Sequence, residues 1–172
     1  NMAAHPEKAE QLGVRSVPWI RIGDFELEGL HTPAELKLWV QRASSEQGIA
    51  DYLSELLTAG QLPRARSALK KHPHWLQHLL TLMSDPESNI NVKVGIGALM
   101  EEFDGSEVLQ AQVPRLIKLS QDSNHSIRGD ACHYLGLSRS HEAIPAIRAR
   151  LQDEHTEVRE IAAETLEELA ME

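Results

Sequence analysis

The chain has 172 residues, enough for one domain and a small second one. Its 17 Lys and Arg residues against 26 Asp and Glu give a net charge of −9, and there is no run of five or more basic residues, so we expect neither nucleic acid nor a membrane surface as a partner. The apolar runs are too short to span a membrane and the single cysteine, Cys132, cannot form an internal disulfide, so we expect a cytoplasmic protein.

The first segment, residues 1–44, has a pattern of mixed secondary structure. A helix-like piece at 6–12 precedes two runs of alternating side chains, at 13–22 and 25–29, which a Gly-Asp pair connects. Two alternating runs around such a turn predict a β-hairpin.

A helix is expected after the hairpin. Thr32 has the residue type of an N-cap, Pro33 suits the first helical position, and Glu35 completes a capping box. We expect this helix to run to about Ala43.

The order of these elements resembles the second half of a thioredoxin-like fold: a helix, the run Gly-Val-Arg-Ser-Val-Pro-Trp, a hairpin, a glycine and an amphipathic helix. In that family the pair matching Val17 and Pro18 forms a cis peptide bond, in a loop that contacts bound substrate. The resemblance marks Ser16, Val17, Pro18 and Trp19 as the remnant of such a loop. The family's Cys-x-x-Cys half is missing, so this chain alone lacks the two thiols that dithiol exchange needs.

The missing half leaves the hairpin without a sheet. Because a lone two-stranded hairpin is marginal in water, we expect its apolar face to pack on the first repeat helices or to pair across a homodimer. We infer that the chain is a fragment or a shortened relative of a longer protein.

From residue 45 onward the pattern is wholly helical. We expect a first helix that ends at Gly60 and a second helix over 62–71. The first helix carries a core-facing stripe of apolar residues with helical spacing, formed by Ile49, Tyr52, Leu53, Leu56 and Leu57.

Two nearly identical units make up the end of the chain. Pro114 recurs as Pro145 and Asp122 recurs as Asp153, at a constant offset of 31 residues. A weaker unit of the same kind, with a longer loop, runs over 74–103. Self-similarity at a fixed period predicts a solenoid, in which each unit is a pair of short helices that stacks on its neighbours.

The sequence of these units resembles that of HEAT-like repeats of the kind first noticed in phycobilin lyases. The resemblance implies an α-solenoid whose members mostly bind proteins. The matching residues are Ala143-Ile144-Pro145, Leu151-Gln152-Asp153, Val158-Arg159 and Ala162-Ala163 before Leu166.

Several polar residues invite a chemical role, but a structural one is favoured for each. Asp122 with Arg128, and Asp153 with Arg159, are expected to cap helices and to form a ladder between neighbouring repeats. Cys132 is expected to be a small buried residue of a repeat helix.

The histidines do not form a predicted metal site. His72, His74 and His78 are interpreted as a surface cluster, because no third ligand accompanies them. His141 and Glu142 form one pair, whereas the HEAT-like deoxyhypusine hydroxylases bind iron through pairs that recur in successive repeats. We therefore expect no metal, no cofactor and no catalytic residue.

Two glycines, Gly95 and Gly97, fall inside a predicted helix. Each costs roughly 1 kcal/mol there relative to alanine. Close packing of a neighbouring helix is the expected reason for both.

These observations predict a mainly α protein: a HEAT-like α-solenoid over 45–172, preceded over 1–44 by a partial thioredoxin-like ββα element. The favoured function is a non-enzymatic scaffold that binds a protein partner or an unfolded client on the face lined by the second helices. The face candidates are Lys93, Arg128, Asp130, His133, Arg159 and Glu160.

Two alternatives stay open. The parent protein could be a thiol-disulfide oxidoreductase or redox-linked chaperone, in which the solenoid holds a client near a dithiol. A lyase or hydroxylase on the solenoid is a weaker alternative, opposed by the missing ligand pairs.

Overall fold

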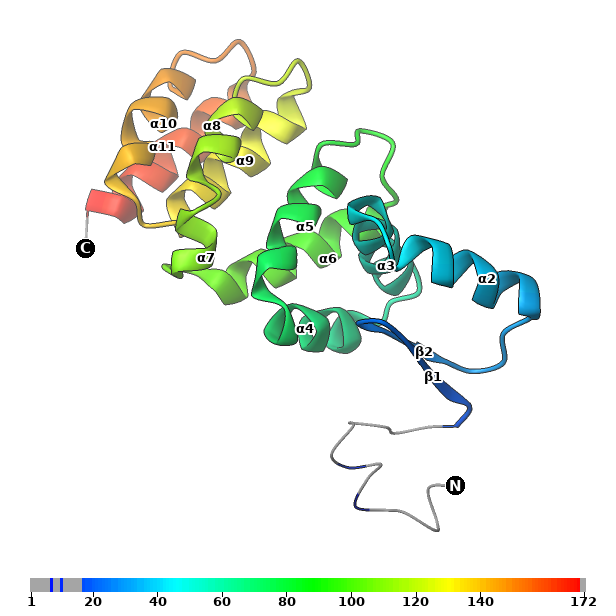
Figure 1. Ribbon diagram of the computed structural model, residues 1–172. Coiled ribbons are helices and arrows are strands. Elements are labelled where there is room, and N and C mark those ends of the chain that lie inside the picture. The colour runs from blue at the N-terminus through cyan, green and yellow to red at the C-terminus, as the bar shows by residue number, and fades with distance from the viewer. Residues whose placement is uncertain (1–6, 8–9, 11–16, 171–172) are drawn as a thin grey trace. The chain divides into compact units, whose positions relative to one another are not determined.

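The structure is a computed structural model, which describes residues 7, 10 and 17–170 (Figure 1). The helix predicted at 6–12 and the first half of the predicted first strand fall almost wholly outside the described residues. The chain divides into two compact units, Asn1–Tyr52 and Leu53–Glu172. This division lies within a helix, whereas the predicted border after residue 44 lies just ahead of it.

The described part of the chain is mainly helical, with one two-stranded antiparallel sheet. The strands and α-helices are β1 (Trp19–Ile22), β2 (Phe25–Glu28), α2 (Pro33–Arg42), α3 (Glu46–Thr58), α4 (Leu62–Lys71), α5 (Leu76–Met83), α6 (Ile90–Met100), α7 (Glu107–Gln110), α8 (Val113–Leu119), α9 (His125–Leu137), α10 (Ile144–Arg150) and α11 (Thr156–Ala170). Short 3₁₀ helices lie at η1 (Pro73–Trp75), η2 (Glu101–Phe103) and η3 (His141–Ala143).

The first unit contains the predicted hairpin and helix. In the hairpin Ile22 pairs with Phe25, and Gly23 in the turn has a φ of 59°, a conformation that glycine adopts without strain. Thr32 and Glu35 form the predicted capping box at the start of α2: the Thr32 hydroxyl accepts from the Glu35 N–H, and the Glu35 carboxylate accepts from the Thr32 N–H.

An aromatic cluster forms the core of this unit. The Phe25 ring stacks on Tyr52 with centroids 4.7 Å apart, and Trp39 meets both rings edge-on. The Tyr52 hydroxyl donates to the Glu26 carbonyl at 2.9 Å. The hairpin therefore packs its apolar face on α2 and on Tyr52 of α3, the first repeat helix, which confirms in part the packing expected for it.

The second unit is built from consecutive helix pairs, as the repeat period predicted. The pairs are α3 with α4, α5 with α6, α8 with α9, and α10 with α11, and in Figure 1 α8 to α11 lie side by side at the C-terminal end. Proline occupies the first turn of α4, α8 and α10, where its missing N–H costs nothing. The largest fully buried side chains are Leu53, Leu69, Leu76, Leu79, Leu80, Ile96, Leu99, Met100, Leu109, Leu116, Leu135 and Ile147.

A buried ion pair joins the last two repeats. The Arg128 guanidinium donates to both carboxylate oxygens of Asp153, from Nε at 2.9 Å and from Nη2 at 2.7 Å. Its Nη1 also donates to the carbonyls of Asp122 and Ser123, in the turn before its own helix. One guanidinium thus fixes the turn of its own repeat and the turn of the next.

The same basic position holds the turn in each repeat. Nη1 of Arg159 donates to the carbonyls of Asp153 and Glu154, and Nζ of Lys93 donates to the Pro86 carbonyl at 2.9 Å. Of these residues only Arg128 forms the predicted ladder between neighbouring repeats, through Asp153, whereas Arg159 and Lys93 donate within their own repeats.

The two aspartates accept hydrogen bonds inside the turns that precede the helices and do not cap the helices themselves. Asp122 accepts from the Asn124 N–H and Asp153 accepts from the His155 N–H, which closes the turn before each helix. Asn124 itself is the N-cap of α9, because its side chain accepts from the Ser126 N–H. The expectation that Asp122 caps the helix is corrected accordingly.

The two glycines of α6 differ in their surroundings. A Cβ on Gly95 would lie 2.6 Å from Cδ2 of Leu57, a buried side chain, so α3 and α6 pack closely there. A Cβ on Gly97 would lie 3.7 Å from the Tyr134 hydroxyl, an ordinary contact distance. Close packing therefore explains Gly95 but not Gly97.

We expect Asp153→Asn to lower the free energy of unfolding by about 2–4 kcal/mol at neutral pH, because it leaves the buried Arg128 guanidinium without its counter-charge. Arg128 and the His155 N–H hold the pKa of Asp153 down to about 2. Since the ordinary pKa is about 3.9, the stabilisation is fully present above about pH 5 and is lost as the pH falls from there to about 2.

Urea unfolding at a series of pH values checks this prediction. The stability difference between wild type and Asp153→Asn should shrink as the pH is lowered from about 5 to about 3. Asp104→Asn is the control, because Asp104 pairs with Arg139 on the surface and should change stability little. A difference that stays constant with pH would contradict the ion-pair account.

We expect Gly97→Ala and Gly95→Ala to have opposite signs. Alanine at 97 should stabilise the protein by about 0.5–1 kcal/mol through helix propensity. Alanine at 95 should destabilise it by about 1–2 kcal/mol, because the new methyl displaces Leu57 in a filled core. Thermal unfolding of the two variants checks this, and equal shifts would contradict the close packing of α3 on α6.

Candidate functional site

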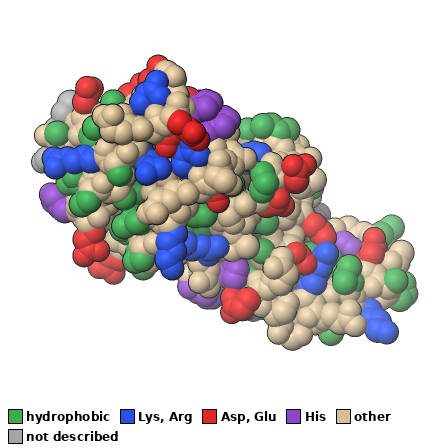
Figure 2. Space-filling view, turned by 90° about the horizontal axis from the view of Figure 1, so that it is seen from above, with side chains coloured by type: hydrophobic (Ala, Val, Ile, Leu, Met, Phe, Trp, Pro, Cys, Tyr) green, Lys and Arg blue, Asp and Glu red, His purple; other side chains and the backbone are tan. Residues whose placement is uncertain are grey.

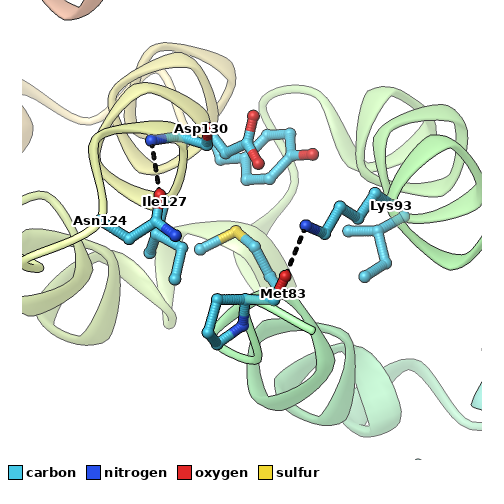
Figure 3. A pocket seen from close by; sticks show the side chains of 9 residues that line it. Met83, Lys93, Asn124, Ile127 and Asp130 are labelled. Carbon is cyan, nitrogen blue, oxygen red and sulfur yellow. Dashed lines mark hydrogen bonds between the residues drawn. The ribbon is translucent and has the colours of Figure 1, made fainter. Parts of the chain in front are cut away.

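A small pocket opens between α6 and α9, from the helix pairs of two neighbouring repeats (Figure 3). Its volume is about 20 Å³, room for a methyl-sized group. The lining residues are Met83, Pro86, Lys93, Ile96, Asn124, Ser126, Ile127, Asp130 and Tyr134.

The pocket has an apolar floor and a charged rim. Met83, Ile96 and Ile127 are buried side chains of the repeat core. Lys93 and Asp130 are exposed and project from the two facing helices (Figure 3). The pocket therefore offers apolar contact at its centre with one charge of each sign at its edge.

The electrostatics of the pocket wall follow from partial desolvation. Burial raises the pKa of Asp130, although the positive charges of His133 and Lys93 oppose the rise. Burial and the charges of Asp130 and Glu101 also raise the pKa of Tyr134, so its hydroxyl stays neutral and can donate a hydrogen bond.

The structure separates the six predicted face residues into three groups. Lys93, Asp130 and Glu160 are exposed, and the first two line the pocket. Arg128 is only 5% exposed and is fully engaged with Asp153 and its own turn, so its assignment to a binding face is wrong. The Arg128 guanidinium is buried in an ion pair with Asp153 and does not face solvent.

The other two face residues are half-buried. Arg159 donates to the carbonyls of its own turn. His133 lies on α9 and its Nε2 is 2.8 Å from the Glu101 carboxylate. On the face shown in Figure 2 acidic and basic side chains are interspersed.

The predicted substrate-loop remnant is described only in part. Ser16 lies outside the described residues. The peptide bond between Val17 and Pro18 is cis, as the resemblance implied, and both residues are exposed, whereas Trp19 is half-buried. Cys132, the chain's one thiol, is fully buried in α9, which confirms the core position expected for it.

The predicted histidine cluster is not wholly on the surface. His72 stacks on Trp75 with centroids 4.5 Å apart, and His78 is only 6% exposed. Within the described residues neither these side chains nor His141 and Glu142 converge as a set of metal ligands.

Sequence reasoning missed a different group, in which His125, His155 and Glu157 converge. The first lies at the start of α9 and the other two at the start of α11. A signal existed, because the 31-residue repeat places His125 and His155 at neighbouring positions of successive units.

None of the helices in the described part of the chain combines the length and the apolar character that crossing a bilayer requires.

Comparison with known proteins identifies the repeats. The family model for HEAT repeats matches residues 76–167, which is more than half of the chain and covers α5 to α11. No curated protein matches the chain in sequence. Together with the stacked helix pairs and their shared turn chemistry, the match shows that the chain belongs to the family of proteins with HEAT repeats.

Proposed function

We propose that this chain is a non-enzymatic scaffold that binds a protein partner across the pocket between α6 and α9. Solenoids present extended surfaces made of equivalent helices, and HEAT repeats commonly serve in protein interaction. The observation that carries the proposal is the apolar pocket with Lys93 and Asp130 at its edge. An apolar centre with a polar rim is the usual anatomy of a protein interface.

The size of the pocket favours a protein over a small molecule. Pockets for small molecules usually measure about 300–1,000 Å³. The volume here is about 20 Å³, which accepts the end of one apolar side chain. A partner would therefore anchor one such side chain and lie over the surrounding helix surface.

The rim specifies the charges of the partner. Asp130 would meet a basic residue of the partner and Lys93 an acidic one, on opposite sides of the anchor (Figure 3). Lys93 already donates to the Pro86 carbonyl, so its ammonium is held in place before binding. Such preorganisation lowers the entropy cost of binding.

The chain's own thiol does not favour the redox alternative. Cys132 is fully buried, and burial raises its pKa to about 11. The thiolate is the form that attacks a disulfide, so this thiol is neither accessible nor ionised at neutral pH. A redox role would have to come from cysteines outside this sequence.

We expect Ser126→Trp to block partner binding. Ser126 lines the pocket and is exposed, and the cap of α9 uses its backbone N–H rather than its side chain. Peptides selected from a display library on the wild-type chain should lose affinity at least tenfold, about 1.4 kcal/mol, for this variant. Fluorescence anisotropy with the selected peptides measures this.

The matched control is Lys118→Trp, which places the same side chain on an exposed position of α8 away from the pocket. Asp130→Lys should weaken peptides that carry a basic residue beside their apolar anchor. Selected peptides that bind wild type and Ser126→Trp equally well would overturn the proposed site.

We expect Cys132 to be unreactive in the folded protein. Because attack requires an exposed thiolate, alkylation by iodoacetamide at pH 8 should be slower by a factor of at least one hundred in the native chain than in urea. Intact-mass spectrometry follows the reaction. Rapid native labelling would show that α9 opens readily and would contradict the packing described.

A further inference from the structure

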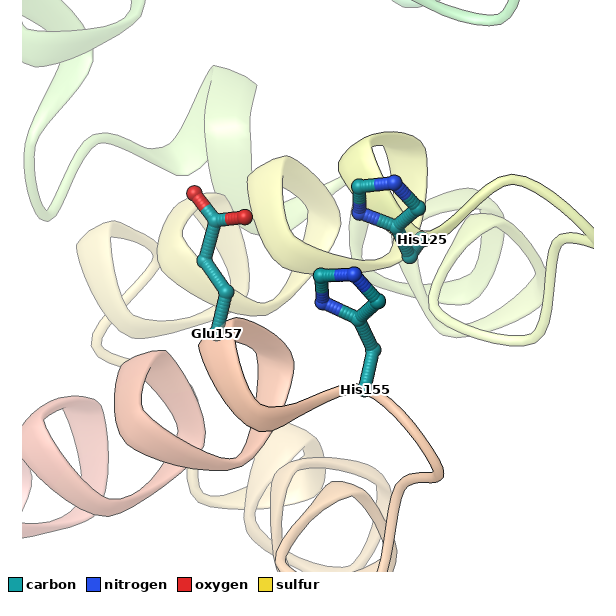
Figure 4. Close-up of side chains that lie close together, drawn as sticks. All are labelled: His125, His155 and Glu157. Carbon is teal, nitrogen blue, oxygen red and sulfur yellow. The ribbon is translucent and has the colours of Figure 1, made fainter.

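Three potential metal ligands from two consecutive repeats meet at one place (Figure 4). His125 is the first residue of α9, His155 precedes α11, and Glu157 lies in the first turn of α11. The two imidazole rings stack with centroids 3.7 Å apart and planes 8° apart. One ligand atom from each of the three side chains lies within 4.8 Å of the other two.

Both rings hold an unused polar atom. Nδ1 of His125 and Nδ1 of His155 are buried, and neither has a hydrogen-bond partner within the described residues. Buried polar atoms normally have partners, because an unpaired one costs free energy. Packing alone does not explain why two adjacent rings each bury an Nδ1 atom that has no hydrogen-bond partner among the described residues.

The repeat fold does not require histidine at either position. At the 31-residue offset, the unit before His155 has Asn124, and the unit after His125 has Thr156. Both equivalents are small polar residues of the kind found at helix starts, and Asn124 is a helix cap. The histidines are therefore departures from the repeat pattern that occur together at one interface.

We propose that His125, His155 and Glu157 bind a Zn²⁺ ion between the last two repeats. Two imidazole nitrogens and a carboxylate oxygen are a common ligand set for zinc, with a fourth position left to water or a partner's side chain. Magnesium and calcium are disfavoured, because they require oxygen ligands. Asp130 lies close enough to Glu157 for the two charges to interact, and this local negative charge attracts a cation.

Binding needs a modest rearrangement. Zinc lies about 2.0–2.1 Å from each ligand, so ligand atoms around a tetrahedral ion are roughly 3.3 Å apart. The ligand atoms here, up to 4.8 Å apart, must move closer. The parallel rings must also tilt, so that each directs an in-plane lone pair at the ion. Glu157 is exposed and can adjust its side chain.

The ion would bind where the ion pair of Arg128 and Asp153 already links the last two repeats. The backbone N–H of His155 donates to Asp153, which is paired with Arg128 of the preceding repeat. A zinc ion between His125 and His155 would therefore link the same two helix starts that the ion pair links. Its expected effect is to stabilise the stack of the last two repeats.

Isothermal titration with ZnCl₂ and thermal unfolding of the full chain test the proposal. We expect one zinc ion per chain and a rise in Tm of roughly 5 °C at a hundredfold excess over Kd, reversed by EDTA. Co²⁺ in place of zinc should give the visible absorption of a tetrahedral site. The variants His155→Asn and His125→Thr restore the chain's own repeat pattern and should fold while losing the zinc response.

Glu157→Gln should weaken zinc binding, and His141→Ala is the control, because His141 is an exposed histidine outside the cluster. The proposal is overturned if the wild type shows neither heat of binding nor a Tm shift with zinc. It is also overturned if His155→Asn and His125→Thr, shown to be folded by circular dichroism, keep the wild-type response.

Discussion

The pairing of Arg128 with Asp153 is the constraint on which the stacking of the last two repeats depends. Both side chains are buried, so each would be costly to desolvate without the other. The guanidinium also binds the carbonyls of its own turn, and the carboxylate also accepts from the His155 N–H. The turn of one repeat therefore cannot move without disturbing the turn of the next, and this fixes how α11 packs on α9.

The turns of the last two repeats are held mainly by arginines that do not line the pocket. Arg128 and Arg159 donate to turn carbonyls, whereas Asp130 and Lys93 line the pocket between α6 and α9, and Lys93 also donates to the Pro86 carbonyl. A scaffold benefits from such a division, because a rigid backbone lowers the cost of ordering the surface on binding. The proposed zinc ligands lie at the starts of α9 and α11, so a metal would stabilise the stacking of the last two repeats beside the pocket residues Asn124 and Ser126.

The repeat architecture could be predicted from the sequence, whereas the site could be predicted only in part. The constant offset from Pro114 to Pro145 revealed the helix pairs, because an identical turn recurs in each unit. Periodicity marks equivalent positions but not the direction of their side chains, so buried Arg128 was assigned to the open face. The contact of His125 with His155 depends on how two units stack, and that information lies in no single unit.

A double-mutant cycle between Arg128 and Asp153 tests the central claim most directly. Urea unfolding at pH 7 would be measured for Arg128→Met, Asp153→Leu and the double variant, and the interaction energy taken as the departure from additivity. Our account predicts a coupling of about 2 kcal/mol or more, with the double variant less destabilised than the sum of the single variants. Additive effects, with a coupling near zero, would contradict it.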